Sequence, residues 1–404
     1  MRIPPRDHPL VRSPLAERAS ELLGNAWAKG RLPEPSLDPD EIWRIAARPL
    51  GDDAEATENA GRGAQDVMDF RKRLERIAAA VSGEADLNPL GRAMAHGQLV
   101  RVVRNRLRLG ALWAKRPEMA LTPLAPPIIV IGHMRSGTTR IHKLLAADPA
   151  HSHTRYCDAY HPVPSRLGVN RAKSALDLAL LGALNPWLQS IHPMAPARAE
   201  EELAWISAAL HHSIYESQWN IPSYSAWSEA RDPVSIYREF ARMLRTDAAH
   251  RGNGNRPRVM KVPAFAEDLA TLLCEFPDSR LVIAQREREA VLRSAVSLAA
   301  NQMAIQSDSC DLDRIEALWR RKIELREARM AEALASWRGP VVRLEFGALG
   351  ADWEAEMRRT YEELGIALTS RALDAMRSEM ASSERGVHRA HSDQLANFAE
   401  PQAG

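Results

Sequence analysis

Cysteine is scarce in this chain of 404 residues, which argues against a secreted, disulfide-bonded protein. The three cysteines are widely separated and form no C-x-x-C pair: Cys157, Cys274 and Cys310. The first residues, MRIPPRDHPLVRSP, do not have the pattern of a secretory signal peptide. We therefore expect a cytoplasmic protein with free thiols.

The chain also lacks an excess of one charge and a long hydrophobic run. Its 54 basic and 52 acidic residues leave a net charge of +2, so the composition does not predict nucleic acid as a partner. The most apolar stretch, residues 175–184, is about half as long as a membrane-spanning helix and contains Asp177. We expect a core helix there and no transmembrane segment.

A strand, a tight loop and a helix start follow one another in residues 127–145, PIIVIGHMRSGTTRIHKLL. The loop lies between Gly132 and Gly137, and the N–H groups of such a loop and helix start point at a bound anion. The spacing is the G-x-x-x-x-G of a P-loop, but Thr138 occupies the position of the phosphate-binding lysine. The cation of the loop is Arg135 instead. The stretch predicts a phosphate cradle.

Four short apolar runs, each followed by a helical pattern, predict a parallel sheet. The runs span residues 128–131, 259–262, 281–284 and 341–344, and the helical patterns span residues 138–147, 264–276, 289–303 and 352–364. This alternation is typical of an α/β fold with a three-layer, P-loop-like parallel sheet flanked by helices.

The rest of the chain is predicted to be mostly helical. Residues 1–120 form a helical N-terminal region, and residues 121–404 form the domain that contains the sheet. Within it, residues 151–250 are a helical insertion after the helix of the first strand, and we expect this insertion to form the substrate pocket. It is rich in aromatic residues, which either line that pocket or belong to the core: Trp187, Trp205, Trp219, Tyr224 and Trp227.

A P-loop kinase or NTPase is one interpretation of the cradle, and two positions argue against it. Such enzymes need the loop lysine on the phosphates and a strand-end carboxylate for Mg²⁺. Here Thr138 replaces the lysine, and the strand at 281–284 ends in Gln285 and Arg286. The residues favour a cradle in which protein cations neutralise a nucleotide without a metal.

Four ordered motifs resemble those of the PAPS-dependent sulfotransferases, whose donor is 3′-phosphoadenosine 5′-phosphosulfate, and in particular the bacterial branch with a P-R-S-G-T-T loop. The motifs are residues 134–139 (MRSGTT), 258–263 (RVMKVP), 276–286 (FPDSRLVIAQR) followed by 294–298 (SAVSL), and 341–346 (VVRLEF). Residues 386–389 (GVHR) are weakly similar to a late G-x-H-R motif. The resemblance covers about residues 125–395.

The resemblance implies a role for each matching position. The 5′-phosphosulfate is expected to contact Arg135, Ser136, Gly137, Thr138 and Thr139, and the 3′-phosphate to contact Arg286 and Ser294. Lys261 ends a buried strand, where a lysine is costly unless it meets an anion. Arg135 and Lys261 are the main catalytic candidates, because sulfuryl transfer depends mostly on positioning and on cations.

The general base stays open among several groups. Many relatives have a histidine two residues after the strand lysine, where this chain has Pro263. Glu201 and Glu202 are the nearest substitutes, since a carboxylate in an aromatic pocket can have a raised pKa. Acidic residues are also favoured in any first helical turn by the helix dipole. The other candidates are histidines: His133, His211 and His212.

The predicted activity is transfer of a sulfuryl group from PAPS to a hydroxyl of a small acceptor, leaving PAP, without a metal. Aromatic and aliphatic residues favour an apolar alcohol, a phenol or a lipid-like acceptor, while a carbohydrate stays open because sugars also stack on tryptophan. The alternatives are a P-loop kinase or NTPase and a non-catalytic PAP-binding protein. The sequence leaves open whether the chain forms a homo-oligomer.

Overall fold

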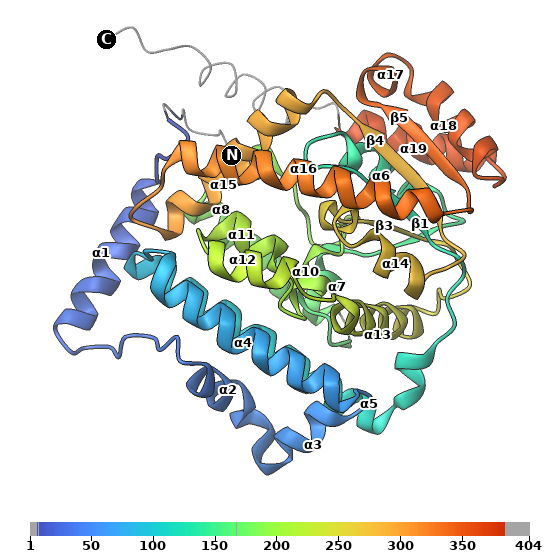
Figure 1. The fold of residues 1–404 in the computed structure, drawn as a ribbon. Coiled ribbons are helices and arrows are strands. Elements are labelled where there is room, and N and C mark those ends of the chain that lie inside the picture. The colour runs from blue at the N-terminus through green and yellow to red at the C-terminus, as the bar shows by residue number, and fades with distance from the viewer. Residues whose placement is uncertain (1–5, 7, 167, 384–404) are drawn as a thin grey trace, which may run out of the picture.

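Five parallel strands form the centre of the fold, in the order β2-β3-β1-β4-β5 (Figure 1). The computed structural model describes residue 6 and residues 8–166 and 168–383. The strands are β1 (Ile128–Ile131), β2 (Ser152–His153), β3 (Arg258–Lys261), β4 (Arg280–Gln285) and β5 (Val341–Glu345). The four predicted strands are confirmed. The sequence analysis missed β2, which has only two residues and no apolar run.

The helices after the sheet strands begin close to the predicted positions. They are α6 (Thr138–Ala147), η3 (Pro263–Ala266), α14 (Leu269–Glu275), α15 (Arg288–Gln306), α16 (Leu312–Ser336), α17 (Phe346–Ala351), α18 (Trp353–Glu363) and α19 (Ser370–Ser383). The pattern at 264–276 is divided into a 3-10 turn and a shorter helix, because the backbone at Asp268 is not helical.

The regions on either side of β1 and α6 are helical. The N-terminal region contains α1 (Pro14–Ala28), α2 (Pro39–Ala47), η1 (Arg48–Asp53), α3 (Ala54–Asn59), α4 (Ala64–Glu84), α5 (Pro89–Lys115) and η2 (Pro117–Leu121). The insertion contains α7 (Tyr156–Tyr160), α8 (Val169–Leu184), α9 (Leu188–Ile191), α10 (Leu203–Ser207), α11 (His212–Gln218), α12 (Pro222–Glu229) and α13 (Val234–Arg251). Residues of α4, α5, α11 and α12 share one hydrophobic cluster.

Alternate residues of the strands pack into two different hydrophobic clusters, one on each face of the sheet. Ile129 and Leu281 belong to a cluster with Phe240 of α13, while Val130 and Val282 belong to a cluster with helices α6 and α18. Every residue of β1 and β3 is buried, as expected for a parallel sheet with helices on both faces. In Figure 1, α13 and α14 lie on one side of the strands and α18 and α19 on the other.

Strand register places the carboxyl ends of three strands together. Val130 pairs with Lys261, and Ile131 pairs with Ile283. The loop after β1, the side chain of Lys261 and the residues after Gln285 therefore meet at one edge of the sheet, where ligands bind in open α/β folds.

The most apolar stretch of the chain is not a core helix, so that expectation is wrong. Residues 175–184 are the second part of α8, in which only Ser174 and Leu178 are buried and Leu176 and Leu180 are exposed. None of the described helices combines the length and the apolar character that crossing a membrane requires.

Candidate active site

The loop between β1 and α6 has the backbone geometry of an anion cradle. Gly132 and Gly137 have positive φ angles of 149° and 95°. A Cβ at Gly137 would lie 2.8 Å from Cδ2 of Phe346, and one at Gly132 would lie 2.8 Å from the carbonyl oxygen of Ala284. Both positions therefore require glycine. Gly137 gives α6 no side-chain cap, so the first N–H groups of the helix stay available to an anion.

Arg135 lies at the centre of this loop in a left-handed conformation with φ of 70°. Its Nε donates to Ser294 Oγ at 2.8 Å, and its Nη1 donates to the carbonyl of Ile191 at 2.8 Å. Arg286 Nη1 donates to the Arg135 carbonyl at 2.7 Å, while its guanidinium lies 4.2 Å from the centre of the Phe346 ring. The structure thus brings together three predicted donor-binding residues from distant parts of the chain.

These two guanidinium groups differ from the buried arginines elsewhere in the molecule. No carboxylate of the described residues lies within ion-pairing distance of Arg135 or Arg286. Burial, together with the neighbouring Arg286, lowers the pKa of Arg135 to about 10. Three arginines buried elsewhere have a carboxylate partner: Arg62 with Glu239, Arg73 with Asp69, and Arg258 with Asp247. Two adjacent cations without a counter-ion form a site for an anion.

The other predicted loop residues surround the same cradle. Ser136 is buried, and its hydroxyl donates to the His133 carbonyl at 2.7 Å, which fixes the turn. Thr138 and Thr139 open α6 and line the cavity described below, together with Arg135.

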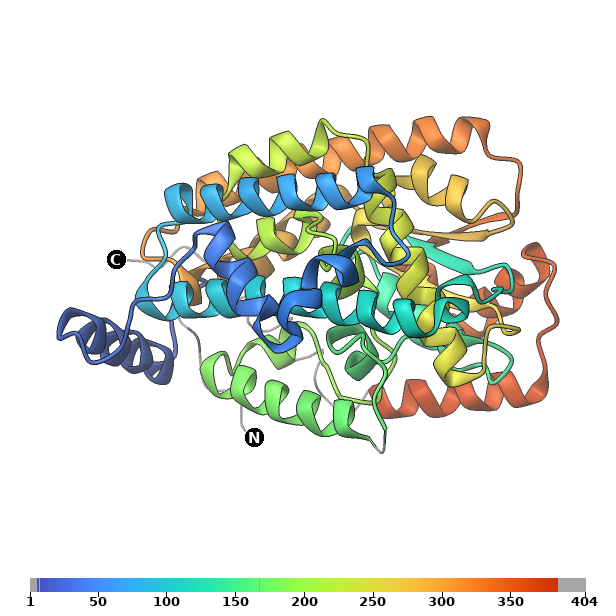
Figure 2. The same ribbon diagram turned by 90° about the horizontal axis from the view of Figure 1, so that it is seen from below.

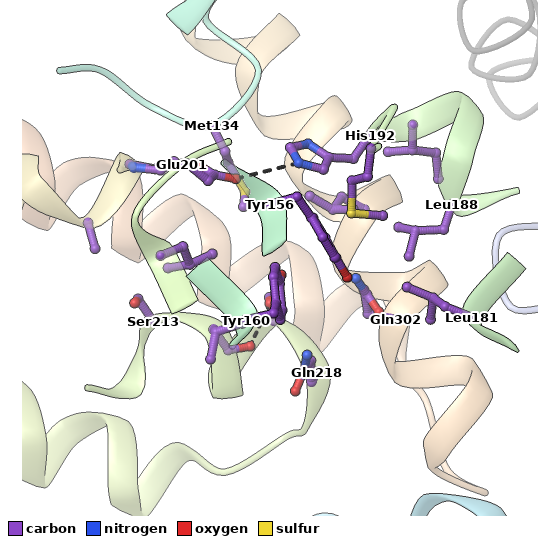
Figure 3. Close-up of a pocket in the computed structure, with 18 of the residues that line it drawn as sticks. Met134, Tyr156, Tyr160, Leu181, Leu188, His192, Glu201, Ser213, Gln218 and Gln302 are labelled. Atoms are coloured by element: carbon purple, nitrogen blue, oxygen red, sulfur yellow. Dashed lines mark hydrogen bonds and ion pairs between the residues drawn. The ribbon is translucent and has the colours of Figure 1, made fainter. Parts of the chain in front are cut away.

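Lys261 forms an ion pair with Glu201 next to the cradle. Its Nζ lies 2.7 Å from Glu201 Oε2, and the two side chains are only 4% and 14% exposed. Glu201 Oε1 lies 3.8 Å from His192 Nε2, as Figure 3 shows, and the same His192 nitrogen lies 3.0 Å from Glu200. Although burial favours the neutral acid, the adjacent His192 and Lys261 lower the pKa of Glu200 to about 2.

Glu202 lies on the side of Lys261 that faces the core. It is fully buried, and its Oε2 accepts a hydrogen bond from the backbone N–H of Lys261 at 2.9 Å. Burial raises the pKa of Glu202 to about 7. Glu201 lines the cavity, whereas Glu202 does not.

A cavity of about 380 Å³ joins these groups. Its polar end contains Arg135, Lys261 and Glu201, and its opposite end is lined by side chains of α5, α8, α11 and α15. Tyr156 and Tyr160 of α7 stack on one another with ring centres 4.3 Å apart, and Figure 3 shows them within the cavity. Further lining residues are Leu181, Leu184, Leu188, Gln98, Gln218 and Gln302.

The aromatic residues singled out in the insertion belong to the core and not to this cavity. Trp205 lies in the cluster beneath the sheet, and Trp219 and Tyr224 lie in the cluster shared with the N-terminal helices. Trp187 is also buried, and Trp227 packs on Tyr224. The sequence reasoning missed Tyr156, Tyr160 and His192, because only the folded chain shows which side chains face the cavity.

The three histidine alternatives lie outside the cavity lining. His133 lies 3.3 Å from Glu327, and burial and Arg326 lower its pKa to about 4. His211 contacts Asp268 at 2.8 Å, and His212 contacts Glu267 at 2.7 Å; both rings are buried. The weak motif at residues 386–389 lies outside the described residues.

Two groups of the described residues bring three possible metal ligands together: His192 with Glu200 and Glu201, and His212 with Glu216 and Glu229. A lysine ammonium already pairs with carboxylates of each group, Lys261 with Glu201 in the first, and Lys322 with Glu216 and Glu229 in the second. These carboxylates are therefore neutralised by protein cations.

A parallel sheet with a glycine-bounded loop and two guanidinium groups at its carboxyl edge is the arrangement expected of a protein that binds a phosphate-type anion. Residues 126–370 match the model of the sulfotransferase family, and the chain belongs to that family. It is therefore a sulfotransferase, and the family implies PAPS as the donor.

Two solved structures are similar to this chain over most of its length. Sulfotransferase STF1 from Mycobacterium tuberculosis H37Rv matches with a TM-score of 0.75 and 26% identity, covering 89% of this chain and 98% of that chain. Sulfotransferase STF9 from Mycobacterium avium matches with a TM-score of 0.73 and 20% identity, covering 90% and 97%. Among curated proteins, none matches the chain.

Proposed function

We propose that this sulfotransferase moves a sulfuryl group from PAPS to the hydroxyl of a small apolar alcohol, phenol or lipid-like acceptor in the cavity beside Lys261. The proposal rests on one observation: two adjacent guanidinium groups, Arg135 and Arg286, lie at a glycine-bounded loop and have no carboxylate partner among the described residues. A ligand with two phosphate-type anions supplies the missing counter-charges.

The residues present fit this donor. The 5′-phosphosulfate would be held by Arg135, Ser136, Gly137, Thr138 and Thr139, and the 3′-phosphate by Arg286 and Ser294. When bound, PAPS supplies an activated sulfuryl group on a phosphate leaving group. The glycine positions support this assignment, since a side chain at either would displace Phe346 or the Ala284 carbonyl and close the cradle.

Arg135 and Lys261 would stabilise the negative charge that develops during transfer. Both are held in place before a ligand arrives, Arg135 by Ser294 and Ile191, and Lys261 by Glu201. Positioned cations in a site that excludes water are worth more than cations in solution, because little reorganisation is needed.

Glu201 is the proposed general base. It faces the cavity, so an acceptor hydroxyl can come within hydrogen-bond reach of its carboxylate. Lys261 and His192 hold the carboxylate through its two oxygens. Glu202 would act as a positioning residue, because it fixes the backbone of Lys261.

The lining of the cavity supports an apolar acceptor. Leucines and the stacked Tyr156–Tyr160 pair form much of the wall, and glutamine amides and the charged side chains of Arg101 and Asp177 provide scattered polar contacts. This composition suits a ligand with one hydroxyl and an apolar body.

The test is incubation with PAPS and a panel of aliphatic alcohols, phenols and sugars, with detection of PAP and of the sulfate ester by mass spectrometry. We expect transfer to apolar alcohols or phenols and its loss in Arg135→Ala and in Lys261→Ala. Activity that survives in both variants would contradict the assigned roles. Mg²⁺-dependent ATP turnover without sulfuryl transfer would favour the kinase alternative.

A further inference from the structure

One solvent-facing side of α8 is apolar. Six exposed residues recur there at the spacing of one helical face and are small or aliphatic: Ala172, Ala175, Leu176, Ala179, Leu180 and Ala183. We call these six residues the α8 stripe. Leu176 and Leu180 are 62% and 57% exposed. A helix at the surface of a water-soluble fold normally has its polar face outward, so this orientation marks an interaction surface.

The charged residues at exposed positions of α8 and just before it are basic. Arg171 and Lys173 lie near the start of α8 and are exposed, and Arg166 precedes the helix at another exposed position. The acidic residue of α8, Asp177, is directed away from this face, since it contacts His161 at 3.0 Å and lines the cavity. An apolar helix face with basic residues at its edge is complementary to an anionic lipid surface.

The α8 stripe is continuous with the acceptor cavity. Leu181 and Leu184 line the cavity. Leu180 belongs to both the α8 stripe and the cavity, because it lines the cavity while more than half of the residue is exposed. The end of α8 is fixed by Ser13, whose hydroxyl donates to the Leu184 carbonyl at 2.8 Å. Figure 2 shows α8, in green, along the lower edge of the described part of the molecule.

We propose that the α8 stripe binds the surface of an anionic membrane and places the cavity mouth against the lipid. The helix lies in the plane of the interface and does not cross it. The acceptor is then an alcohol dissolved in the membrane, which enters the cavity past Leu180; this second part rests on the proposed function. Burial of two leucines and several alanines with nearby basic residues gives reversible binding.

Vesicle flotation of the whole chain, without PAPS, tests the docking surface directly. We expect binding to vesicles of phosphatidylcholine mixed with an equal amount of phosphatidylglycerol, and much weaker binding to phosphatidylcholine alone. Leu176→Glu, which does not alter the cavity lining, should weaken binding by about tenfold or more. The double variant Arg171→Gln, Lys173→Gln should also lose about tenfold or more on the anionic vesicles.

Met68→Glu is the matched control, because Met68 is 58% exposed on α4, which Figure 2 shows, in blue, in the upper half of the molecule, away from α8. Its vesicle binding should equal that of the wild type. Circular dichroism of each variant checks that the fold is retained.

Three results would overturn the docking proposal. They are absence of wild-type binding to either vesicle, equal loss of binding in Met68→Glu and Leu176→Glu, and a dimer that Leu176→Glu converts to a monomer, which would assign the α8 stripe to a second copy of this chain.

Transfer assays distinguish a failure of the docking proposal from a failure of the proposed function. Leu176→Glu should keep transfer to a water-soluble alcohol and lose transfer to a long-chain alcohol in vesicles. Vesicle binding without transfer to any hydroxyl would contradict only the proposed function.

Discussion

Replacement of Glu201 by glutamine isolates proton acceptance from the other roles of this residue. Glutamine keeps the size of the side chain and an oxygen that can accept from Lys261 Nζ, now 2.7 Å away, but it has no basic carboxylate. A positioned general base contributes about 10²–10⁴-fold to a rate. We therefore expect kcat to fall by this factor, which corresponds to about 3–5 kcal/mol in the activation barrier.

The assay is single-turnover sulfuryl transfer to the best acceptor of the panel, together with calorimetry of PAP binding. The Kd for PAP should stay within about threefold of the wild type, since Glu201 is not among the residues assigned to the donor. Glu202→Gln is the matched control in the same acidic run. Glu202 contacts the backbone N–H of Lys261 and does not line the cavity, so the kcat of this variant should fall by less than about tenfold.

The refuting result is a kcat in Glu201→Gln within about threefold of the wild type while Lys261→Ala is inactive. Proton acceptance would then belong to another group, or the hydroxyl would not need a base. A similar loss in Glu201→Gln and Glu202→Gln would instead show that the position of Lys261 is the sensitive feature.

Three further predictions concern the donor cradle and stability. Arg286→Ala should weaken PAP binding by about 10- to 100-fold, because charge-assisted hydrogen bonds are lost, and an unchanged Kd by calorimetry would exclude the assignment. Gly137→Ala should lower stability by about 1–3 kcal/mol through its φ of 95° and its clash with Phe346, whereas Gly97→Ala, in open space on α5, should be neutral or stabilising in thermal unfolding. The raised pKa of Glu202, about 7 against 4.5, means that the folded protein keeps a proton that the unfolded chain has lost, so its contribution to stability falls as pH rises through this window. Glu202→Gln removes this fall. Measured by urea unfolding, the free energy of unfolding of the variant should rise relative to that of the wild type by up to about 3 kcal/mol between about pH 5 and pH 8. Parallel pH curves for the two proteins would contradict the cause given.

Much of the fold could be predicted because buried parallel strands have continuous apolar runs. Ile128–Ile131 is such a run, and its strand was assigned without error. β2 could not be found in this way, since Ser152–His153 pairs with β3 through backbone hydrogen bonds and has no apolar pattern. For the helix at 175–184, the sequence predicted burial and the structure shows exposure. Its composition indicates burial, but which face meets protein depends on tertiary packing that periodicity does not record.

The residues of the candidate site that belong to sequence motifs could be predicted. The residues that come together only when the chain folds could not. Arg135 and Ser294 are 159 positions apart, and the structure joins them by one hydrogen bond. The family resemblance of the loop and of the motif that contains Ser294 implied this grouping. The walls of the cavity come from five or more helices, and no local pattern identified Tyr156 or Tyr160 as lining residues.

The conformation of Arg135 links the fold to the chemistry. A left-handed backbone at a residue other than glycine costs roughly 1–2 kcal/mol, and a guanidinium without a carboxylate partner adds a further penalty for burial. The Ser294 hydroxyl and the Ile191 carbonyl satisfy the hydrogen bonds of this guanidinium but supply no negative charge. Both costs are present in the ligand-free protein, so an anion that binds here meets a cation already oriented and partly desolvated. Because the strain is present before binding, more of the interaction energy remains, under the proposed function, for the leaving phosphate, where negative charge increases as the S–O bond breaks.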